Sequence, residues 1–242
     1  MKAEVNSIRM GYEVFGQTGM SVVLIHGFAL DRTIWREVAQ KYLPNQRVIL
    51  PDVRGHGQSD VPVGTYAMST LAEDLAGLLA FLSINKAILC GHSMGGYISL
   101  AFAEQYPERL AGLGLITTRA KADSEDKKEG RYALVEAVRE KGSAALAEAM
   151  PSKLTQDEDI QDITRALILH TAPNGIIGAA KGMAERPDRT DLLKKIDVPA
   201  LVVAGEQDQI IDYKESQQMA ANLPQGEFDG IPGAGHLPML ET

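Results

Sequence analysis

Apolar residues along this chain occur either in short unbroken runs or at helical spacing, and the two patterns alternate. Short unbroken runs are typical of strands that are buried on both faces of a sheet. The runs that predict strands are 21–25, 47–50, 86–90, 110–116, 199–205 and 225–231, with 11–15 in an N-terminal hairpin. The segments that predict helices are 31–42, about 70–82, 94–106 and 213–222. This alternation predicts an α/β fold with a mostly parallel, doubly wound sheet.

Some local contacts can also be predicted from polar residues beside these elements. Asp31 is placed to cap the first helix, and Ser69 or Thr70 to cap the second, because short polar side chains accept hydrogen bonds from free N–H groups at helix starts. Asp52 and Arg54 follow the strand at 47–50 and are expected to form a structural ion pair.

The stretch 118–189 interrupts the alternation, because it contains no run that predicts a buried strand. Its spacing predicts four helices, at 123–141, 143–150, 156–169 and 173–185. We therefore predict a core formed by residues 1–117 and 190–242, with a helical cap, 118–189, inserted before the last two strands. Ligands of open α/β sheets bind at the carboxyl ends of the strands, so we expect this cap to cover the site.

Composition narrows the class of protein. The chain has 242 residues, of which 45% are hydrophobic, enough for a sizeable core. A net charge of −8 argues against nucleic acid and anionic membranes as main partners. The single cysteine, Cys90, excludes an intrachain disulfide and is expected to be an inert thiol. No apolar run predicts a membrane span or a signal peptide, so we expect a cytoplasmic protein.

The motif with the clearest chemistry is Gly91-His92-Ser93-Met94-Gly95, between a predicted strand and a predicted helix. A serine on a sharp strand-to-helix turn is exposed above the sheet, and small flanking residues permit the tight packing that such a turn needs. Ser93 would also lie at a helix N-terminus, where N–H groups favour developing negative charge. We predict that Ser93 is a nucleophile.

A serine nucleophile needs a base, and the base needs a group that orients it. His236 lies in a glycine-rich loop after the last predicted strand and is the expected base. Asp208 follows the preceding strand and is the favoured acid, in the chain order Ser93, Asp208, His236. Glu206 and Asp123 remain alternatives for the acid.

The oxyanion of an acyl-transfer reaction needs backbone N–H donors. We expect these donors at Met94, directly after the nucleophile, and at Phe28, in the loop after 21–25. His26, His56 and His92 are expected to hydrogen-bond loop backbone. No spacing of these residues predicts a metal site, and no glycine-rich nucleotide loop is present, so no cofactor or metal is predicted.

Taken together, these motifs resemble those of the α/β-hydrolase superfamily in order and spacing over nearly the whole chain. The segments that carry the resemblance are His26-Gly27-Phe28, 52–59, 91–96, 205–208 and 233–236. Within the superfamily the chain is similar to small carboxylesterases, enol-lactonases and carbon–carbon hydrolases with a helical cap. A serine at the turn distinguishes it from haloalkane dehalogenases and epoxide hydrolases. Cofactor-free perhydrolases also resemble it, although they often have tryptophan where Phe28 stands.

The resemblance implies a serine hydrolase that acts on small-molecule carboxylic esters through an acyl-enzyme. A lactonase, a carbon–carbon hydrolase or a perhydrolase are the alternatives on the same scaffold. A ligand-binding protein without activity is a more distant alternative, because a fold alone does not give function. We expect Met150, Leu154 and Met183 of the cap to line the substrate pocket together with the Phe28 side chain.

The chain departs from the superfamily in two places. No proline follows the acid closely in 208–212, and the chain ends at Thr242, where the family usually adds a final helix that packs on the sheet. The resemblance therefore implies either a shortened chain or a homo-oligomer in which a partner chain covers that face. Otherwise, apolar side chains on the face would be open to solvent.

Overall fold

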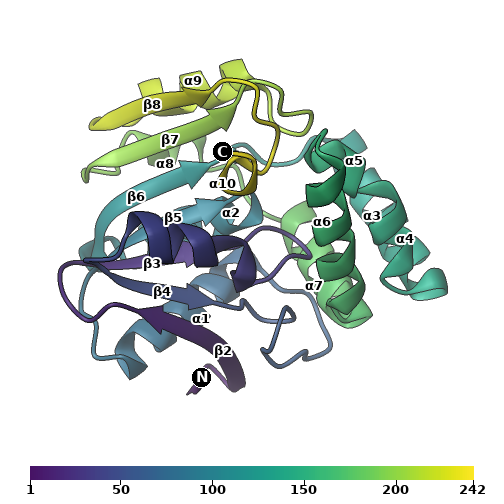
Figure 1. The fold of residues 1–242 in the computed structure, drawn as a ribbon, viewed down its shortest axis with the longest axis horizontal. Coiled ribbons are helices and arrows are strands. Elements are labelled where there is room, and N and C mark those ends of the chain that lie inside the picture. Colours follow the sequence, from purple (N-terminus) through teal and green to yellow (C-terminus); the bar gives the residue numbers. More distant parts are fainter.

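The computed structural model describes residues 1–242 and contains one eight-stranded sheet with helices on both faces (Figure 1). The strand order is β1-β2-β4-β3-β5-β6-β7-β8. The first two strand pairs are antiparallel and the remaining pairs are parallel. The strands are β1 (Lys2–Val5), β2 (Ile8–Phe15), β3 (Ser21–Ile25), β4 (Arg47–Pro51), β5 (Ala87–His92), β6 (Leu110–Ile116), β7 (Ala200–Gly205) and β8 (Gly226–Ile231). The predicted α/β class and mostly parallel sheet are confirmed.

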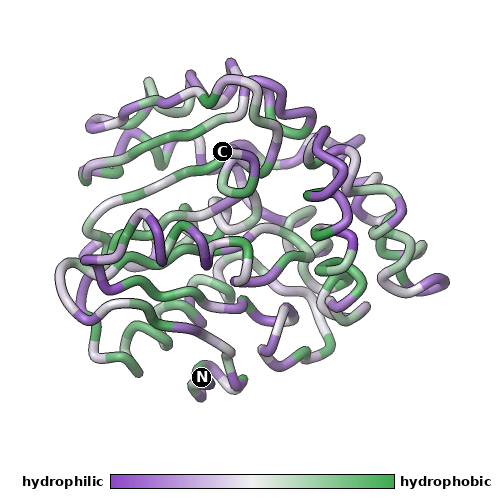
Figure 2. Tube along the Cα trace, viewed as in Figure 1, coloured by the Kyte–Doolittle hydropathy of each residue, from purple (hydrophilic) through white to green (hydrophobic).

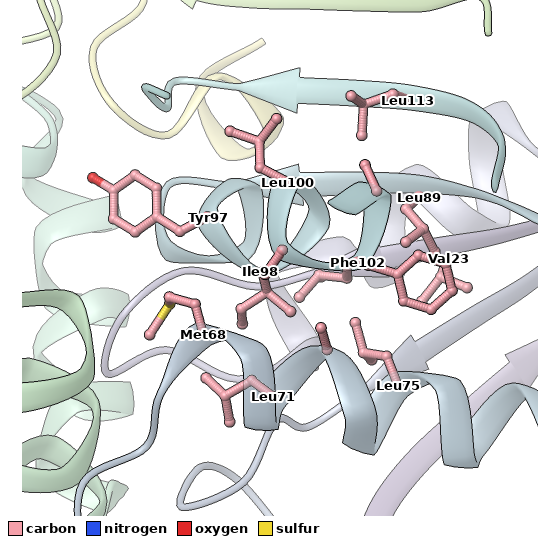
Figure 3. Packing of buried hydrophobic residues seen from close by; sticks show 14 of the residues in the cluster. Val23, Met68, Leu71, Leu75, Leu89, Tyr97, Ile98, Leu100, Phe102 and Leu113 are labelled. Carbon is pink, nitrogen blue, oxygen red and sulfur yellow. The ribbon is translucent and has the colours of Figure 1, made fainter. Parts of the chain in front are cut away.

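Four helices pack against one face of the sheet. The larger buried cluster joins inward side chains of the strands to α1 (Met68–Phe81), α2 (Met94–Gln105), α8 (Thr190–Leu193) and α9 (Tyr213–Ala221). Figure 3 shows Leu71 and Leu75 of α1 facing Ile98 and Phe102 of α2, with strand residues such as Leu89 above them. Each fully buried side chain of this size stabilises the fold by about 1.5–3 kcal/mol. This packing fixes α2, and with it the turn that precedes α2.

The opposite face is covered less evenly. Two short helices, a 3₁₀-helix at Arg32–Trp35 and a π-helix at Val38–Tyr42, pack over β3 and β4. Over β7 the cover is incomplete, because Leu201 remains 42% exposed while its neighbour Val202 is fully buried. Through Gly114, Leu201 is in register with Cys90 of β5, which is also partly exposed. Apolar side chains of this face are therefore open to solvent; self-association through the face remains a prediction.

The segment 118–189, which we predict to be a helical insertion, lies beyond the carboxyl ends of the parallel strands (Figure 1). Its helices are α3 (Glu125–Lys141), α4 (Ala144–Ala149), α5 (Pro151–Leu154), α6 (Glu158–His170) and α7 (Pro173–Ala184). In Figure 2 the central strands are largely green, whereas hydrophilic segments gather on the outer helices such as α6. None of the helices combines the length and apolar character needed to span a bilayer. The insertion is thus placed over the edge of the sheet at which ligands bind in such folds.

Several local predictions differ from the structure. The segment 31–42 forms the two short helices instead of one α-helix, although Asp31 does cap the first by accepting a hydrogen bond from Thr33 N–H at 2.8 Å. The cap predicted at Ser69 or Thr70 is wrong, because α1 already begins at Met68 and has no side-chain cap.

The predicted Asp52–Arg54 pair is also wrong. Asp52 instead pairs with Arg32, while Arg54 reaches Asp74 of α1 at 2.7 Å. Asp52 and Arg54 are only two residues apart, but they bond to different parts of the chain. Each forms a long-range ion pair that no local pattern could predict.

Candidate active site

Ser93 stands between β5 and α2 on a turn with φ 51° and ψ −112°. Such a conformation costs a non-glycine residue about 1–3 kcal/mol and persists only where the surroundings hold it. The Ser93 N–H donates to the Ile116 carbonyl at 2.9 Å, and the Ser93 carbonyl accepts from the Thr118 hydroxyl at 2.7 Å. Ser93 is partly exposed although His92 and Met94 on either side are buried. The turn therefore raises this one side chain out of the core.

Two glycines make the turn possible by allowing close backbone approach. A Cβ on Gly91 would lie 2.2 Å from the Gly95 carbonyl oxygen, and one on Gly95 would lie 2.5 Å from the Ile25 carbonyl oxygen. Real Cβ atoms do not approach backbone this closely, so a larger residue would force α2 away from β5 at Gly91 and away from β3 at Gly95. This geometry is the reason for the small residues that flank Ser93 in the sequence.

The structure brings His236 and Asp208 together. His236 Nδ1 lies 2.8 Å from Asp208 Oδ2, and both side chains are only 2% exposed. The other carboxylate oxygen, Oδ1, accepts hydrogen bonds from the N–H groups of Ile210 at 2.7 Å and Ile211 at 3.1 Å. Because these two bonds fix the carboxylate, Asp208 can hold the imidazole in one orientation with Nε2 directed away from it.

Neither alternative acid contacts His236. Asp123 bonds Arg131 and, at 2.9 Å, Arg186, while Glu206 is exposed. Burial alone would raise the pKa of Asp123, but the hydrogen bonds from Arg186 and Arg131 outweigh it and lower the pKa to about 2. Asp123 is therefore a buried carboxylate that ties together helices of the insertion.

The His236 backbone is held from three sides. Its N–H donates to the Leu154 carbonyl of the insertion at 2.8 Å, and its carbonyl accepts from the Thr117 hydroxyl at 3.0 Å. The same carbonyl lies 2.9 Å from His92 Nε2. A carbonyl only accepts, so His92 Nε2 carries the proton and Nδ1, which has no partner, is an unprotonated nitrogen. Burial, together with His236, holds the pKa of His92 well below its usual range.

Two backbone N–H groups, those of Met94 and Phe28, have no acceptor within the chain. Met94 is the first residue of α2, so its N–H has no intrahelical acceptor. The Phe28 N–H donates to no other group of the chain, although the next two residues, Ala29 and Leu30, both donate to loop acceptors. Phe28 and Met94 therefore remain the candidate oxyanion donors.

A cavity between the sheet edge and the insertion contains the reactive groups. Ser93 and His236 both line it, and so do all four residues expected in the substrate pocket. The lining residues are Phe28, Leu30, His92, Ser93, Tyr97, Arg131, Met150, Leu154, Met183, Ile210 and His236. Most are apolar, as is usual for small-molecule sites. No pattern in the sequence predicted that Tyr97, Arg131 or Ile210 would lie here.

The other histidines in the loops support the turns around the site. His26 lies 2.8 Å from the Gly27 carbonyl and accepts from Val53 N–H at 3.0 Å. His56 lies 3.0 Å from the Arg54 carbonyl and accepts from Ala29 N–H at 3.2 Å. Each ring thus has one donating and one accepting nitrogen, as the neutral form requires, and burial lowers the pKa of His56 to about 3. No group of three or more His, Cys, Asp or Glu side chains is arranged to hold a metal ion.

Glu241 is a residue of the site that the sequence did not predict. One carboxylate oxygen accepts from Gly235 N–H at 2.8 Å and from Leu237 N–H at 3.3 Å, on either side of His236. The other accepts from the hydroxyl of Thr155, directly after α5. Glu241 therefore connects the His236 loop to the insertion. Its position five residues after His236 was the only signal, and it has meaning only once the loop is folded.

Comparisons with known proteins agree with this geometry. The family described as "alpha/beta hydrolase fold" matches residues 21–242. A solved esterase from Thermogutta terrifontis, described as malate bound, is similar with a TM-score of 0.95 and 42% identity, covering 100% of this chain and 92% of that one.

Two curated relatives cover most of the chain. 3-Oxoadipate enol-lactonase 2 of Acinetobacter baylyi is 27% identical over 97% of this chain and 88% of its own length. A non-heme chloroperoxidase of Streptomyces lividans is 32% identical over 88% of this chain and 85% of its own length. The family match covers the turn at Ser93, the loop that contains Asp208 and the loop that contains His236. Because the match covers nearly the whole chain, the chain belongs to the α/β-hydrolase family.

Proposed function

We propose that the protein is a serine hydrolase of carboxylic esters that acts through an acyl-enzyme. The observation that carries this proposal is a strained, partly exposed Ser93 that lines one cavity with His236, whose imidazole is paired with the buried Asp208. A hydroxyl, an imidazole and an orienting carboxylate are the groups that acyl transfer by serine requires. Similarity to an esterase and an enol-lactonase supports the same class of reaction.

The steps follow from these positions. His236 Nε2 takes the Ser93 proton as Oγ attacks the substrate carbonyl, and the Phe28 and Met94 N–H groups stabilise the oxyanion. His236 then protonates the leaving alcohol, and an acyl-enzyme remains. Water, deprotonated by the same imidazole, then attacks the acyl group. As this second tetrahedral intermediate collapses, the His236 imidazolium gives the proton to Ser93 Oγ, and the carboxylic acid is released. Asp208 stabilises the imidazolium at both stages without taking its proton.

The insertion, 118–189, serves in this proposal as a cap that shapes the pocket. It contributes Met150, Leu154 and Met183 to the cavity that contains Ser93. Its Leu154 carbonyl also accepts from the His236 N–H and so fixes the backbone of the base. The cap therefore both selects the substrate and positions the base.

A lactonase is the second candidate. Opening a lactone needs the same nucleophile, base and oxyanion donors as ester hydrolysis, and an enol-lactonase is among the relatives. A perhydrolase is favoured less, since Phe28 stands where that group often has tryptophan, although a chloroperoxidase is also a relative. Assays with simple lactones, and with peroxide and acetate, distinguish these activities from ester hydrolysis.

The direct test uses p-nitrophenyl esters of increasing acyl length together with a fluorophosphonate. We expect a burst of p-nitrophenol, followed by a slower steady rate if deacylation is limiting. We also expect stoichiometric covalent labelling of Ser93, located by peptide mass spectrometry. Labelling of another residue, or no turnover of any ester or lactone, would contradict the proposed function.

Acyl-chain preference should change when a cap side chain is shortened. Met150 lines the cavity and is only partly buried, so Met150→Ala enlarges the pocket at little cost in stability. We expect the ratio of kcat/KM for a hexanoyl over an acetyl ester to rise about tenfold, since one methylene in an apolar pocket changes selectivity by about 10- to 200-fold at most. Met20→Ala is the control, because Met20 is 48% exposed on the core. An equal shift in both variants would remove Met150 from the pocket.

Glu241 should act as a positioning residue. In Glu241→Gln the amide N–H₂ faces either two backbone N–H groups or the Thr155 hydroxyl, so one of the two contacts must change, and the negative charge that strengthens the bonds from the His236 loop is lost. We expect kcat to fall about tenfold with KM nearly unchanged, because a misplaced base slows proton transfer more than binding. Glu227→Gln, on the exposed side of β8, is the control. A fall in melting temperature with unchanged kcat would show a purely structural role.

A further inference from the structure

A second cavity adjoins the catalytic one, with Tyr97, Arg131 and Ile210 lining both. Three cationic side chains, Arg119, Lys127 and Arg131, line the second cavity, and Asp123 is the only carboxylate among its lining residues. The chain as a whole carries a net charge of −8. The cavity beside Ser93 therefore has an excess of positive charge in a protein that is negatively charged overall.

The donors of Arg131 are mostly unused. Its Nε bonds Asp123, while its two terminal nitrogens form no hydrogen bond with any other group of the chain. A guanidinium carries five N–H donors in a planar fork, and the terminal nitrogens hold four of them. The side chain is 22% exposed and lines both cavities, so these donors face the space next to Ser93.

Lys127 lies one helical turn before Arg131 on α3, and it forms no ion pair and no hydrogen bond within the chain. Burial, together with Arg119, lowers the pKa of its ammonium group. Like charges at i and i+4 destabilise a helix by a few tenths of a kcal/mol. Lys127 and Arg131 therefore line one cavity although their repulsion lowers the stability of α3. Lys127 has no partner in the chain, and only one nitrogen of the Arg131 guanidinium is bonded.

The surrounding charges do not cancel this excess. Asp123 is already bonded to Arg131 and Arg186, and the Arg186 guanidinium lies 4.0 Å above the Tyr97 ring. Arg119 donates to the Ile210 carbonyl at 2.7 Å and lies 3.6 Å from Glu215. Four cations thus face two carboxylates around this cavity.

We propose that Arg131 and Lys127 form an anion subsite, so that the substrates are esters or lactones that carry a carboxylate beside the scissile bond. This inference rests on the proposed hydrolase function and names its substrate class. The Arg131 fork suits a carboxylate, which it can bind through two parallel N–H···O bonds. Lys127 adds a second charge that also attracts the anion from a distance.

The test compares matched substrates with and without the carboxylate. When the charge is on the acyl side, monoethyl succinate is compared with ethyl pentanoate. When it is on the alcohol side, 4-acetoxybutyrate is compared with pentyl acetate. We expect kcat/KM for the charged member of at least one pair to exceed that of the neutral member about tenfold at low salt, and the ratio to shrink as salt screens the charges.

Two variants locate the effect, and one controls for net charge. Lys127→Gln and Arg131→Gln should each lower the charged-to-neutral ratio about five- to tenfold. The control is Lys141→Gln, which removes one positive charge from the other end of α3. At a rise of about 1.5 Å per residue, Lys141 lies about 20 Å from Lys127 along the helix axis. The control should leave the ratio unchanged.

The outcomes separate this inference from the proposed function. Hydrolysis of neutral esters with no preference for the charged member of either pair overturns the anion subsite and leaves the hydrolase standing. Equal effects of Lys127→Gln and Lys141→Gln also overturn it, because they show only a response to net charge. Failure to hydrolyse any ester or lactone instead contradicts the proposed function itself.

Discussion

Replacing Ser93 with alanine is expected to abolish ester hydrolysis and leave the fold intact. Loss of the nucleophile of a serine triad costs about 10⁴-fold or more in rate. The exchange removes one hydroxyl from a partly exposed position, and the bonds that hold the turn come from the Ser93 backbone and not from its side chain. Initial rates with a p-nitrophenyl ester and a thermal melt measure the two effects separately.

Ser99→Ala is the matched control for this experiment. Ser99 also lies on α2, and its hydroxyl donates to the Gly95 carbonyl at 2.9 Å. Loss of that bond should cost about 1 kcal/mol of stability and little activity. If Ser93→Ala kept more than about a tenth of the activity, against the far larger loss expected of a nucleophile, Ser93 would not be the attacking group.

The strands could be predicted because a buried parallel strand needs an unbroken apolar run. Leu110–Ile116 is such a run and forms β6 over its full predicted length. Helices that end at proline or glycine are nearly as clear, as α2 shows by ending just before Pro107. In these segments the local pattern and the tertiary packing require the same residues.

The sequence was less informative where tertiary contacts decide the structure. In 31–42, the spacing fits an α-helix, but the chain forms a 3₁₀ turn that buries Trp35 and then a π-helix. The short α5 escaped prediction because four residues are too few for any periodicity. The bond from His236 N–H to the Leu154 carbonyl joins loops far apart in sequence. Such a bond cannot be predicted from the sequence, because almost every residue type carries the same backbone N–H and C=O groups.

The candidate site likewise contains residues that the sequence predicts and residues that it does not. Ser93 and the His236–Asp208 pair were predictable because a strained turn needs small neighbours and because triad chemistry needs a set order of groups. Arg131 and Glu241 were not, since each acquires its role only through a partner that the fold brings near. The sequence predicts a helix at 123–141 but not which of its charged residues line the cavity beside Ser93.

The second large effect is expected at Asp208. In Asp208→Asn the amide oxygen should stay at the Oδ1 position, where the Ile210 and Ile211 N–H groups donate to it. The new N–H₂ then faces His236 Nδ1, which must accept, so the ring proton moves to Nε2. An imidazole protonated at Nε2 cannot take the Ser93 proton. We therefore expect kcat to fall about 10⁴-fold while substrate binding and melting temperature change little.

Asp123→Asn should show the opposite profile. Its carboxylate bonds Arg131 and Arg186 and is only 2% exposed, so loss of the charge leaves buried cations unpaired and costs about 3–5 kcal/mol. The melting temperature should drop by about 10 °C, with kcat for a neutral ester within about tenfold of the parent. Because the pKa of Asp123 is lowered to about 2, this stability is present above the ordinary carboxyl range and is lost as the pH falls toward 2. The reverse ranking of kcat in the two variants would make Asp123 the orienting acid.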